Sequence, residues 1–210
     1  MRMDTRKLDL YKTHAKEYAA TSRPAIVTVG PAQYLCVEGR GAPEGAQYAE
    51  ALTALYAIAF GIKMAYKKTA GVDYAVCKLE GLWWGDVTST AEFQRLPRSA
   101  WRWKLMIRTP EFIAQQHLQA AIADALKKGK PGAVSAVTLE TLDEGTCAQL
   151  LHTGSYTSES EHSIPALHGF IESEGLRFHG LHHEIYLSDP RKVAPEKLKT
   201  ILRHPVRKAS

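Results

Sequence analysis

The stretch His182-His183-Glu184-Ile185-Tyr186-Leu187-Ser188-Asp189-Pro190 combines a predicted strand with two side chains suited to acid–base chemistry. Residues that favour β-structure continue until Ser-Asp-Pro ends the run, a pattern typical of a short strand. Side chains alternate along a strand, so Glu184 and Tyr186 share one face with His182, whereas Ile185 lies on the other. We therefore take Glu184 and Tyr186 as the candidate catalytic pair. The alternatives are a glutamate paired with an Arg or Lys of a neighbouring strand and a tyrosine that only packs.

Outward from this strand, the chain alternates strand-like and helix-like segments. Apolar residues recur at helical spacing in three segments, and short runs bounded by Gly, Pro, Asp or Ser predict the strands. The predicted strands cover residues 25–29, 33–38, 74–79 with its extension to 85, 101–107, 134–139, 147–151, 181–188 and 198–203. The predicted helices cover residues 47–66, 110–128 and 160–174, after an N-terminal arm or short helix within residues 1–24. This order predicts an α+β fold, and the clean alternation of residues 101–107 predicts an antiparallel sheet with one packed face.

An internal repeat divides the main domain, residues 25–210, into two similar halves of about 25–110 and 133–206. Residues 104–110 and 199–205 both read Lys-x-x-aliphatic-Arg-x-Pro, and residues 37–55 resemble residues 152–170. Each half then has the order strand, helix, strand, strand, which favours a duplication. The repeat aligns Glu80 with the position that Glu184 holds in the second half.

Charge and composition exclude several classes of protein. The net charge is +5, but residues 191–210 carry seven Lys and Arg and one Glu, so the excess is confined to one end. No helix-turn-helix or RNP-like motif accompanies it, and we expect no nucleic-acid binding. We interpret the basic end as a solvated edge strand. Three scattered cysteines favour neither a disulfide framework nor a zinc site and indicate a reducing compartment. With no apolar run long enough for a membrane span and no evident signal peptide, we expect a cytoplasmic protein.

Several stretches together resemble a known family: residues 9–12, 38–43, 55–63, 79–84, 101–110, 151–156, 183–190 and 199–205. They are similar to the stand-alone GyrI-like small-molecule-binding proteins, which are relatives of the effector-binding domains of multidrug-sensing transcription regulators. The resemblance implies a duplicated β-α-β-β module, a curved antiparallel sheet with helices on one side and a central ligand cleft. It also implies a glutamate at the centre of that cleft, ringed by aromatic residues, and Glu184 sits in the matching motif.

Aromatic residues are the candidates for the wall of the cleft, because flat or cationic ligands stack on aromatic faces. The four tryptophans lie close together in sequence, and adjacent residues of a strand point to opposite sides. We therefore expect one of Trp83 and Trp84 to line the site together with Trp101 and Trp103, although tryptophans on strands usually fill the core. The remaining candidate ligand-binding residues are Glu80, Tyr56, His152 and Tyr156. Glu80 fits a salt bridge equally well, and the spacing of the histidines matches no metal site.

Three hypotheses of function follow. The first is binding of bulky hydrophobic or aromatic molecules, such as drugs or toxins, in an aromatic cleft with a central glutamate. The second rests on the resemblance, because some stand-alone members open the cyclopropane ring of DNA-alkylating cyclopropanoid compounds with water. Glu184 would then activate water, Tyr186 would assist, and no cofactor would be needed. The third is a protein-binding inhibitor of a topoisomerase. We expect a small-molecule partner and no membrane, and a homodimer is left open.

Overall fold

The computed structural model of this 210-residue chain describes residues 7–87, 90–159 and 161–209. The first six residues of the expected N-terminal arm and the first residue of the expected helix 160–174 therefore lie outside the described residues. The chain forms two compact units. The first unit comprises Met1–Thr13, Ala32–Cys77 and Trp84–Leu142, and the second comprises His14–Pro31, Lys78–Trp83 and Asp143–Ser210.

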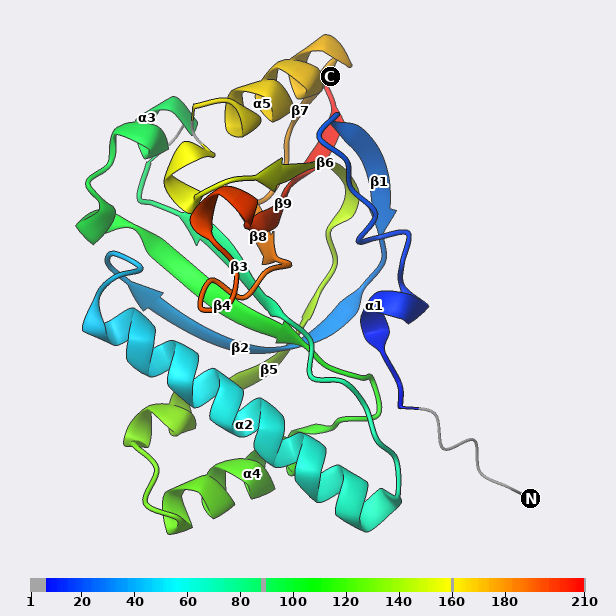
Figure 1. Ribbon diagram of the computed structural model, residues 1–210, viewed down its shortest axis with the longest axis vertical. Coiled ribbons are helices and arrows are strands. Elements are labelled where there is room, and N and C mark those ends of the chain that lie inside the picture. Colours follow the sequence, from blue (N-terminus) through cyan, green and yellow to red (C-terminus); the bar gives the residue numbers. More distant parts are fainter. Residues whose placement is uncertain (1–6, 88–89, 160, 210) are drawn as a thin grey trace. The chain divides into compact units, whose positions relative to one another are not determined.

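In the first unit, a three-stranded antiparallel sheet is covered by two helices. Strand β2 (Ala32–Arg40) lies between β4 (Arg102–Arg108) and β5 (Thr138–Leu142). Helix α2 (Ala46–Ala70) packs on β2 and β4, and helix α4 (Gln115–Lys127) packs on α2 (Figure 1). The residues Leu55, Ile58 and Ile62 of α2 are fully buried against the sheet and the neighbouring helix. The short elements of this unit are α1 (Leu10–Thr13), α3 (Thr90–Arg95), η1 (Arg98–Ala100) and η2 (Gly132–Ala136).

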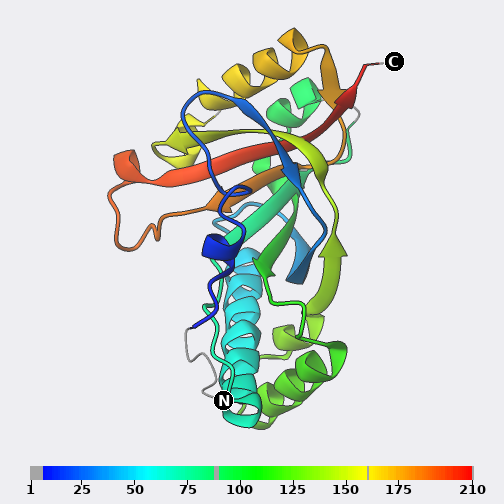
Figure 2. The same cartoon turned by 90° about the vertical axis from the view of Figure 1, so that its right-hand side faces the viewer.

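In the second unit, five strands form an antiparallel sheet in the order β1-β6-β9-β8-β3. Their bounds are Ala25–Val29 (β1), Gly145–Thr153 (β6), Lys199–Lys208 (β9), His182–Tyr186 (β8) and Leu79–Trp84 (β3), and β7 (Leu176–Phe178) pairs with the end of β9. Helix α5 (Ser163–Ser173) lies along one face of this sheet (Figure 2). The core under it consists of Ala148, Leu150, Leu167, Ile171, Leu202 and Val206. The turns η3 (Tyr156–Ser158) and η4 (Pro195–Lys197) complete the unit.

The element order confirms the predicted duplication of a strand, helix, strand, strand module. The first copy is β2-α2-β3-β4 and the second is β6-α5-β8-β9, with α3 and β7 as additions. The mixed α+β class and the antiparallel pairing of the strands are as predicted from the sequence. Within the described part of the chain, none of the helices has the length and apolar character needed to cross a bilayer.

Three element boundaries predicted from the sequence are wrong. The strand predicted over 74–79 begins only at Leu79, because Tyr74 is buried in a single bridge with Leu8. The helix predicted from residue 110 begins at Gln115, because Gln33 binds the carbonyl oxygens of Pro110 and Ile113 and holds a turn there. The strand predicted over 134–139 is replaced by η2, which Pro131 and the small residues after it favour, and β5 starts at Thr138.

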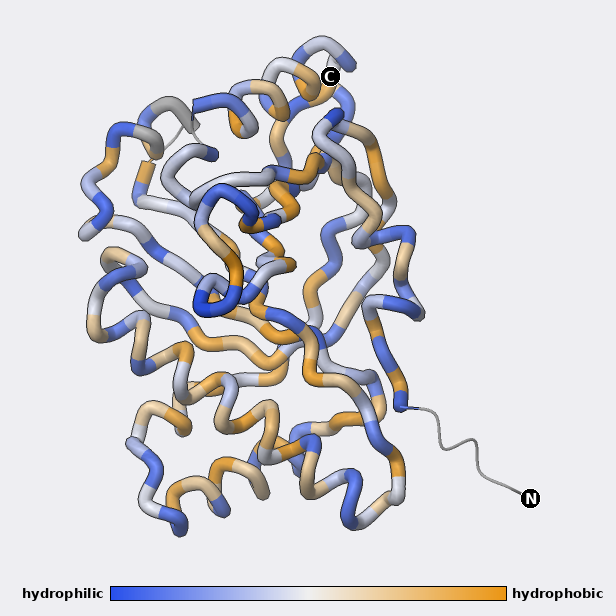
Figure 3. Tube along the Cα trace, viewed as in Figure 1, coloured by the Kyte–Doolittle hydropathy of each residue, from blue (hydrophilic) through white to orange (hydrophobic). Residues whose placement is uncertain are grey.

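The interpretation of the basic end as a solvated edge strand is also wrong. Strand β9 is an interior strand of its sheet, since β6 pairs with one side and β8 with the other. Seven consecutive residues, 200–206, are buried, including Arg203, and only the ends of the strand are exposed. The hydrophilic residues of this end of the chain lie mainly in the segment between β8 and β9, which Figure 3 shows largely in blue. The sequence predicted that only one face of residues 101–107 is packed. This is correct at the start of the segment but not at its end, where Met106 is buried as well as Leu105.

Candidate functional site

Strand β8 presents different chemistry on the two faces of the second unit's sheet. Glu184 lies opposite Leu202 of β9 and Tyr186 lies opposite Thr200, so both share the face that α5 packs against. His183 lies opposite Arg203 on the other face. The alternation predicted from the sequence therefore holds, and it separates the candidate catalytic pair from a second group of charged residues.

The candidate pair forms a continuous chain of hydrogen bonds with one of the predicted tryptophans. Trp83 donates from Nε1 to Oη of Tyr186 over 3.1 Å, and Tyr186 donates from Oη to Oε2 of Glu184 over 2.8 Å. The other carboxylate oxygen, Oε1, lies 3.3 Å from Nε2 of His182. Each donor in such a chain polarises the next one, which strengthens the hydrogen bond that reaches the carboxylate. Glu184 is thus engaged by a phenol and an imidazole, not by the Arg or Lys of the alternative interpretation.

A glycine leaves the room that this hydrogen-bonded chain needs. Gly81 of β3 lies directly opposite Glu184 in the register. A Cβ atom at this position would lie 3.1 Å from Nε1 of Trp83 and 3.3 Å from Oη of Tyr186. A side chain here would therefore press on both partners of the Trp83–Tyr186 hydrogen bond.

A second carboxyl group, Glu159, belongs to the same environment. Glu159 follows η3, is only 3% exposed, and its Oε1 is buried without a hydrogen-bond partner among the described residues. Burial, followed by the negative charge of Glu184, raises the pKa of Glu159 to about 10, although the neighbouring Thr200 acts in the opposite direction. Glu159 is therefore a neutral carboxylic acid at pH 7, and it stands beside a carboxylate.

Glu159 is a candidate site residue that sequence reasoning did not single out. The internal repeat carried a signal, because it aligns Glu159 with Glu44 of the first half. Glu44 is exposed and forms an ion pair with Arg98. The repeat places the same residue type at both positions, but it does not indicate that Glu159 is buried.

Tyr156 contributes an aromatic surface beside Tyr186. Its ring meets the ring of Tyr186 edge-on, with the centroids 5.5 Å apart, and the residue is 37% exposed. Partial burial and then the charges of Glu159, Glu184 and Asp189 raise the pKa of Tyr156 to about 12. Tyr156 is thus a neutral phenol over the physiological range.

His152, another predicted ligand-binding residue, holds the turn that precedes Glu159. It is buried on β6, where its Nδ1 lies 2.8 Å from Oγ of Ser163 and its Nε2 lies 3.1 Å from the carbonyl oxygen of Ser155. Gly154 makes the tight bend possible, since its φ of 151° lies in the region that favours glycine. His152 therefore ties the turn to the first residue of α5.

The opposite face of the sheet carries a buried ion-pair network. His183 lies between two carboxylates, with Nε2 3.1 Å from Oε2 of Glu80 and Nδ1 3.0 Å from Oε1 of Glu144. Arg203 lies 3.0 Å from Oε2 of Glu144. The structure therefore places Glu80 in a salt bridge on the other face, which was the alternative given for it, and not beside Glu184. Instead, Glu159 lies near Glu184.

Charge pairing outweighs burial in this network. Burial alone would raise the pKa of Glu144, but His183 and Arg203 lower it to about 2. Burial alone would lower the pKa of His183, but Glu144 and Glu80 raise it to about 9. His183 is accordingly an imidazolium at neutral pH.

The network also anchors the segment that leads into β1. Tyr18 donates a hydrogen bond of 3.2 Å to Oε1 of Glu80, and Arg203 donates to the carbonyl oxygen of Glu17 over 2.5 Å. Gln149 donates to the carbonyl oxygen of Ala19 over 3.0 Å. The buried charges thus fix residues 17–19, which identifies this face as structural.

The remaining predicted aromatic residues lie in the first unit. Trp103 is completely buried, with its indole N–H bound to the carbonyl oxygen of Gly41 and its ring edge-on to Tyr48. A Cβ atom at Gly39 would collide with the Trp103 ring, at 2.2 Å from the nearest atom, so this glycine makes the close packing possible.

The other three aromatic candidates of the first unit are less buried. Trp101 stacks on Phe93 with centroids 5.3 Å apart. Tyr56 stacks on Phe60 along α2, and Trp84 is the partly buried last residue of β3. Among the tryptophans, Trp83 is the one that hydrogen-bonds to the candidate catalytic pair.

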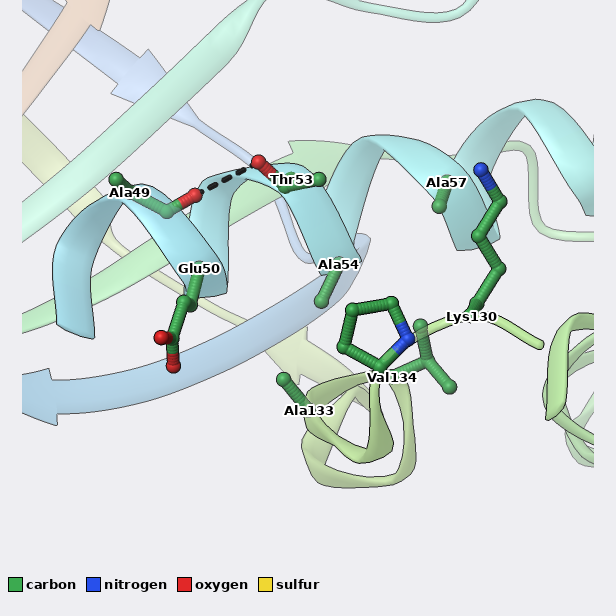
Figure 4. A pocket seen from close by; sticks show the side chains of 9 residues that line it. Ala49, Glu50, Thr53, Ala54, Ala57, Lys130, Ala133 and Val134 are labelled. Atoms are coloured by element: carbon green, nitrogen blue, oxygen red, sulfur yellow. Dashed lines mark hydrogen bonds between the residues drawn. The ribbon is translucent and has the colours of Figure 1, made fainter. Parts of the chain in front are cut away.

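The first unit contains a small apolar hollow between α2 and the segment that includes η2 (Figure 4). Its volume is about 220 Å³, and its lining consists of Ala49, Glu50, Thr53, Ala54, Ala57, Lys130, Pro131, Ala133 and Val134. None of the residues predicted as ligand-binding lines this hollow. Within residues 7–87, 90–159 and 161–209, no three His, Cys, Asp or Glu side chains are grouped to hold a metal ion.

Comparisons with known proteins agree with the resemblance seen in the sequence. Residues 22–207 match the family of GyrI-like small molecule binding domains. A crystal structure of a conserved protein from Listeria innocua shares 40% identity and a TM-score of 0.86, with 96% of this chain and 100% of that chain covered. A Listeria innocua protein described as a hydrolase shares 39% identity and a TM-score of 0.84 over the same shares. The C-terminal domain of EcmrR, at 12% identity and a TM-score of 0.58, covers 89% of this chain and 98% of its own, a likeness of fold alone. No curated protein matches the chain.

Proposed function

The chain belongs to the family of GyrI-like small-molecule-binding domains, and from this premise we propose that it is a cofactor-independent hydrolase of bulky aromatic molecules. The observation that carries the proposal is the hydrogen-bonded chain from Trp83 through Tyr186 to Glu184. It presents a polarised carboxylate beside aromatic rings. The description of a 39% identical Listeria innocua protein as a hydrolase supports the same reaction class.

The aromatic side chains provide the binding surface. Tyr156 is partly exposed and meets Tyr186, whose hydroxyl in turn holds the indole of Trp83. Aromatic faces bind flat apolar ligands by stacking, and a nearby carboxylate favours a ligand that is cationic or carries a polarised bond. Bulky aromatic compounds with an electrophilic carbon satisfy both requirements.

The carboxylate supplies the base. Glu184 takes a proton from water while the water oxygen forms a bond to the electrophilic carbon and the bond to the leaving atom breaks. Tyr186 donates its hydroxyl hydrogen to Glu184 at the start; once Glu184 takes the proton of water, this hydrogen is released to donate to the negative charge that develops, and Trp83 keeps the hydroxyl oriented. A cyclopropane ring conjugated to a latent phenolate is the substrate class that we propose, because ring strain provides the driving force and the phenolate accepts the electron pair.

The test is chromatographic. The protein and the variant Glu184→Gln are each incubated with a cyclopropane-bearing DNA-alkylating compound, and the ring-opened water adduct is measured. We expect product from the parent and none above background from the variant, with Glu172→Gln, an exposed residue of α5, as the matched control that retains activity.

Other outcomes would assign a different role. Quenching of tryptophan fluorescence by the compound without product from either protein would leave binding alone, the activity suggested by the fold of effector-binding domains. Absence of both signals would argue against a small-molecule site on β8 and favour a protein partner, such as a topoisomerase.

A further inference from the structure

Glu159 and Glu184 have the same side-chain chemistry but different surroundings. Building on the hydrolase proposed above, we propose that Glu159 is a second catalytic carboxyl group, which holds a proton while Glu184 acts as the base and delivers it to the phenolate oxygen that receives the electron pair of the broken bond.

The backbone around Glu159 is rigidly held. Its carbonyl oxygen accepts a hydrogen bond of 2.9 Å from the N–H of Ile164, in the first turn of α5. His152 ties the preceding turn to Ser163 and Ser155 on the other side. Because the backbone is held on both sides of Glu159, fewer positions are open to its side chain. An acid–base residue needs this preorganisation.

The strand register brings this turn toward the catalytic pair. Thr200 of β9 lies opposite Tyr186 on one side and opposite His152 on the other, and it is completely buried. Thr200 is also the side chain next to Glu159. Glu159, Thr200 and Tyr186 therefore belong to one cluster on the α5 face of the sheet.

The two carboxyl groups differ in burial and in their hydrogen-bond partners. Glu184 accepts a hydrogen bond from the hydroxyl of Tyr186 and lies beside the imidazole of His182. Glu159 is buried, whereas Glu184 is only partly buried, and Oε1 of Glu159 has no hydrogen-bond partner among the described residues. The pKa of Glu159, raised to about 10 by burial and by Glu184, agrees with this division. Two neighbouring carboxyl groups whose environments separate their protonation states are the usual arrangement of an acid and a base.

The reaction balances with these two groups and water. The water oxygen forms a bond to the electrophilic carbon, and its proton passes to Glu184. The bond between that carbon and the neighbouring ring carbon breaks, its electron pair passes through the conjugated system to the phenolate oxygen, and this oxygen takes the proton from Glu159. The proton on Glu184 then returns the pair to its starting state by transfer to Glu159, so that the net change is addition of one water.

The first unit provides an internal contrast. Glu44 occupies the equivalent position of the repeat but is exposed and paired with Arg98, so it lacks the burial that Glu159 has. The same residue type therefore has an acid's environment in one copy of the repeat only.

The first test is the variant Glu159→Gln, which keeps the shape and removes the transferable proton. With the cyclopropane-bearing compound, we expect kcat to fall by about 100-fold or more while KM stays within about threefold, as for loss of a general acid. Glu161→Gln, an exposed position two residues further along, is the matched control with unchanged kcat. A kcat of Glu159→Gln within threefold of the parent would overturn the proposal.

The second test measures protonation directly, first in the parent protein. The ¹³C chemical shift of the Glu159 carboxyl group, followed by NMR between pH 5 and pH 9, should remain that of a protonated acid, and in Glu184→Gln its titration should move to lower pH. Titration near pH 4 in the parent protein would overturn the proposal even if the variant were inactive. Absence of product from the parent would instead overturn the hydrolase itself, and the acid role with it, whereas a normal parent and an unaffected Glu159→Gln would remove the acid role alone.

Discussion

Tyr186 donates its hydroxyl hydrogen to Oε2 of Glu184 over 2.8 Å while its oxygen accepts a hydrogen from Trp83. Glu184 and Tyr186 are separated by one position on β8, which is the spacing at which side chains share a face of a strand. This relationship aligns the phenol toward the carboxylate before any ligand arrives. The functional value of each partner can therefore be measured separately.

Tyr186→Phe removes the donor and keeps the ring. We expect turnover of the cyclopropane-bearing compound to fall by about 10- to 1000-fold, because one donor to developing negative charge contributes on that order. Binding measured by tryptophan fluorescence should change less than about threefold. Equal losses of binding and turnover would show that the hydroxyl contributes to ligand binding and not to the chemical step, and no loss of either would show that the ring alone is sufficient.

Gly81→Ala tests the hydrogen-bonded chain without altering either member of the pair. The new Cβ atom would lie 3.1 Å from Nε1 of Trp83 and 3.3 Å from Oη of Tyr186, both tighter than ordinary contact, so the two partners of this hydrogen bond must shift by a few tenths of an ångström. We expect about a tenfold loss of turnover and a blue-shifted or quenched tryptophan emission. The matched control is Gly169→Ala in α5, where a Cβ atom meets nothing within 4 Å. It should keep full activity and stabilise the helix by about 0.5–1 kcal/mol.

The alternation of side chains along β8 could be predicted from the sequence. Strand periodicity alone was enough to place Glu184 and Tyr186 together on one face, because every residue of a strand must point to one side or the other. The repeat was likewise visible, since both copies keep the Lys-x-x-aliphatic-Arg-x-Pro pattern. Periodicity does not say which neighbouring strand pairs with β8. The register with β3, which puts Glu80 opposite Ile185 and hence away from Glu184, is a long-range property.

The burial of individual charged residues could not be predicted from the sequence. Arg203 and Lys208 both belong to a basic run, yet Arg203 is 1% exposed and bound to Glu144, whereas Lys208 is exposed. Composition treats them alike, because an arginine is buried only where a carboxylate of a distant segment compensates its charge. The raised pKa of Glu159 could not be predicted for the same reason, because it depends on burial and on Glu184, which is 25 positions away in the sequence.

Breaking the buried ion pair should cost far more stability than breaking an exposed one. Glu144→Ala leaves Arg203 buried without its carboxylate, so the free energy of unfolding should fall by about 3–5 kcal/mol. Glu44→Ala removes the exposed ion pair with Arg98, and its effect should stay below about 1 kcal/mol. Urea unfolding of the two variants at pH 7 measures both values. Similar losses would mean that the Glu144 network contributes no more than a surface pair.

Stability should also depend on pH through His183. Its pKa is about 9 in the folded protein, above the value near 6.5 of an unfolded histidine, so the stabilisation is complete below pH 6.5 and is lost as the pH rises through 9. Glu144 acts in the opposite direction at the acid end, because its pKa of about 2 makes its contribution decline as the pH falls from about 4.5 toward 2. The free energy of unfolding, measured with urea at intervals from pH 5 to pH 10, should therefore decrease on the alkaline side. In His183→Gln this alkaline decrease should be smaller, although the variant is less stable throughout. An identical alkaline slope in both proteins would show that His183 is not protonated in the folded state.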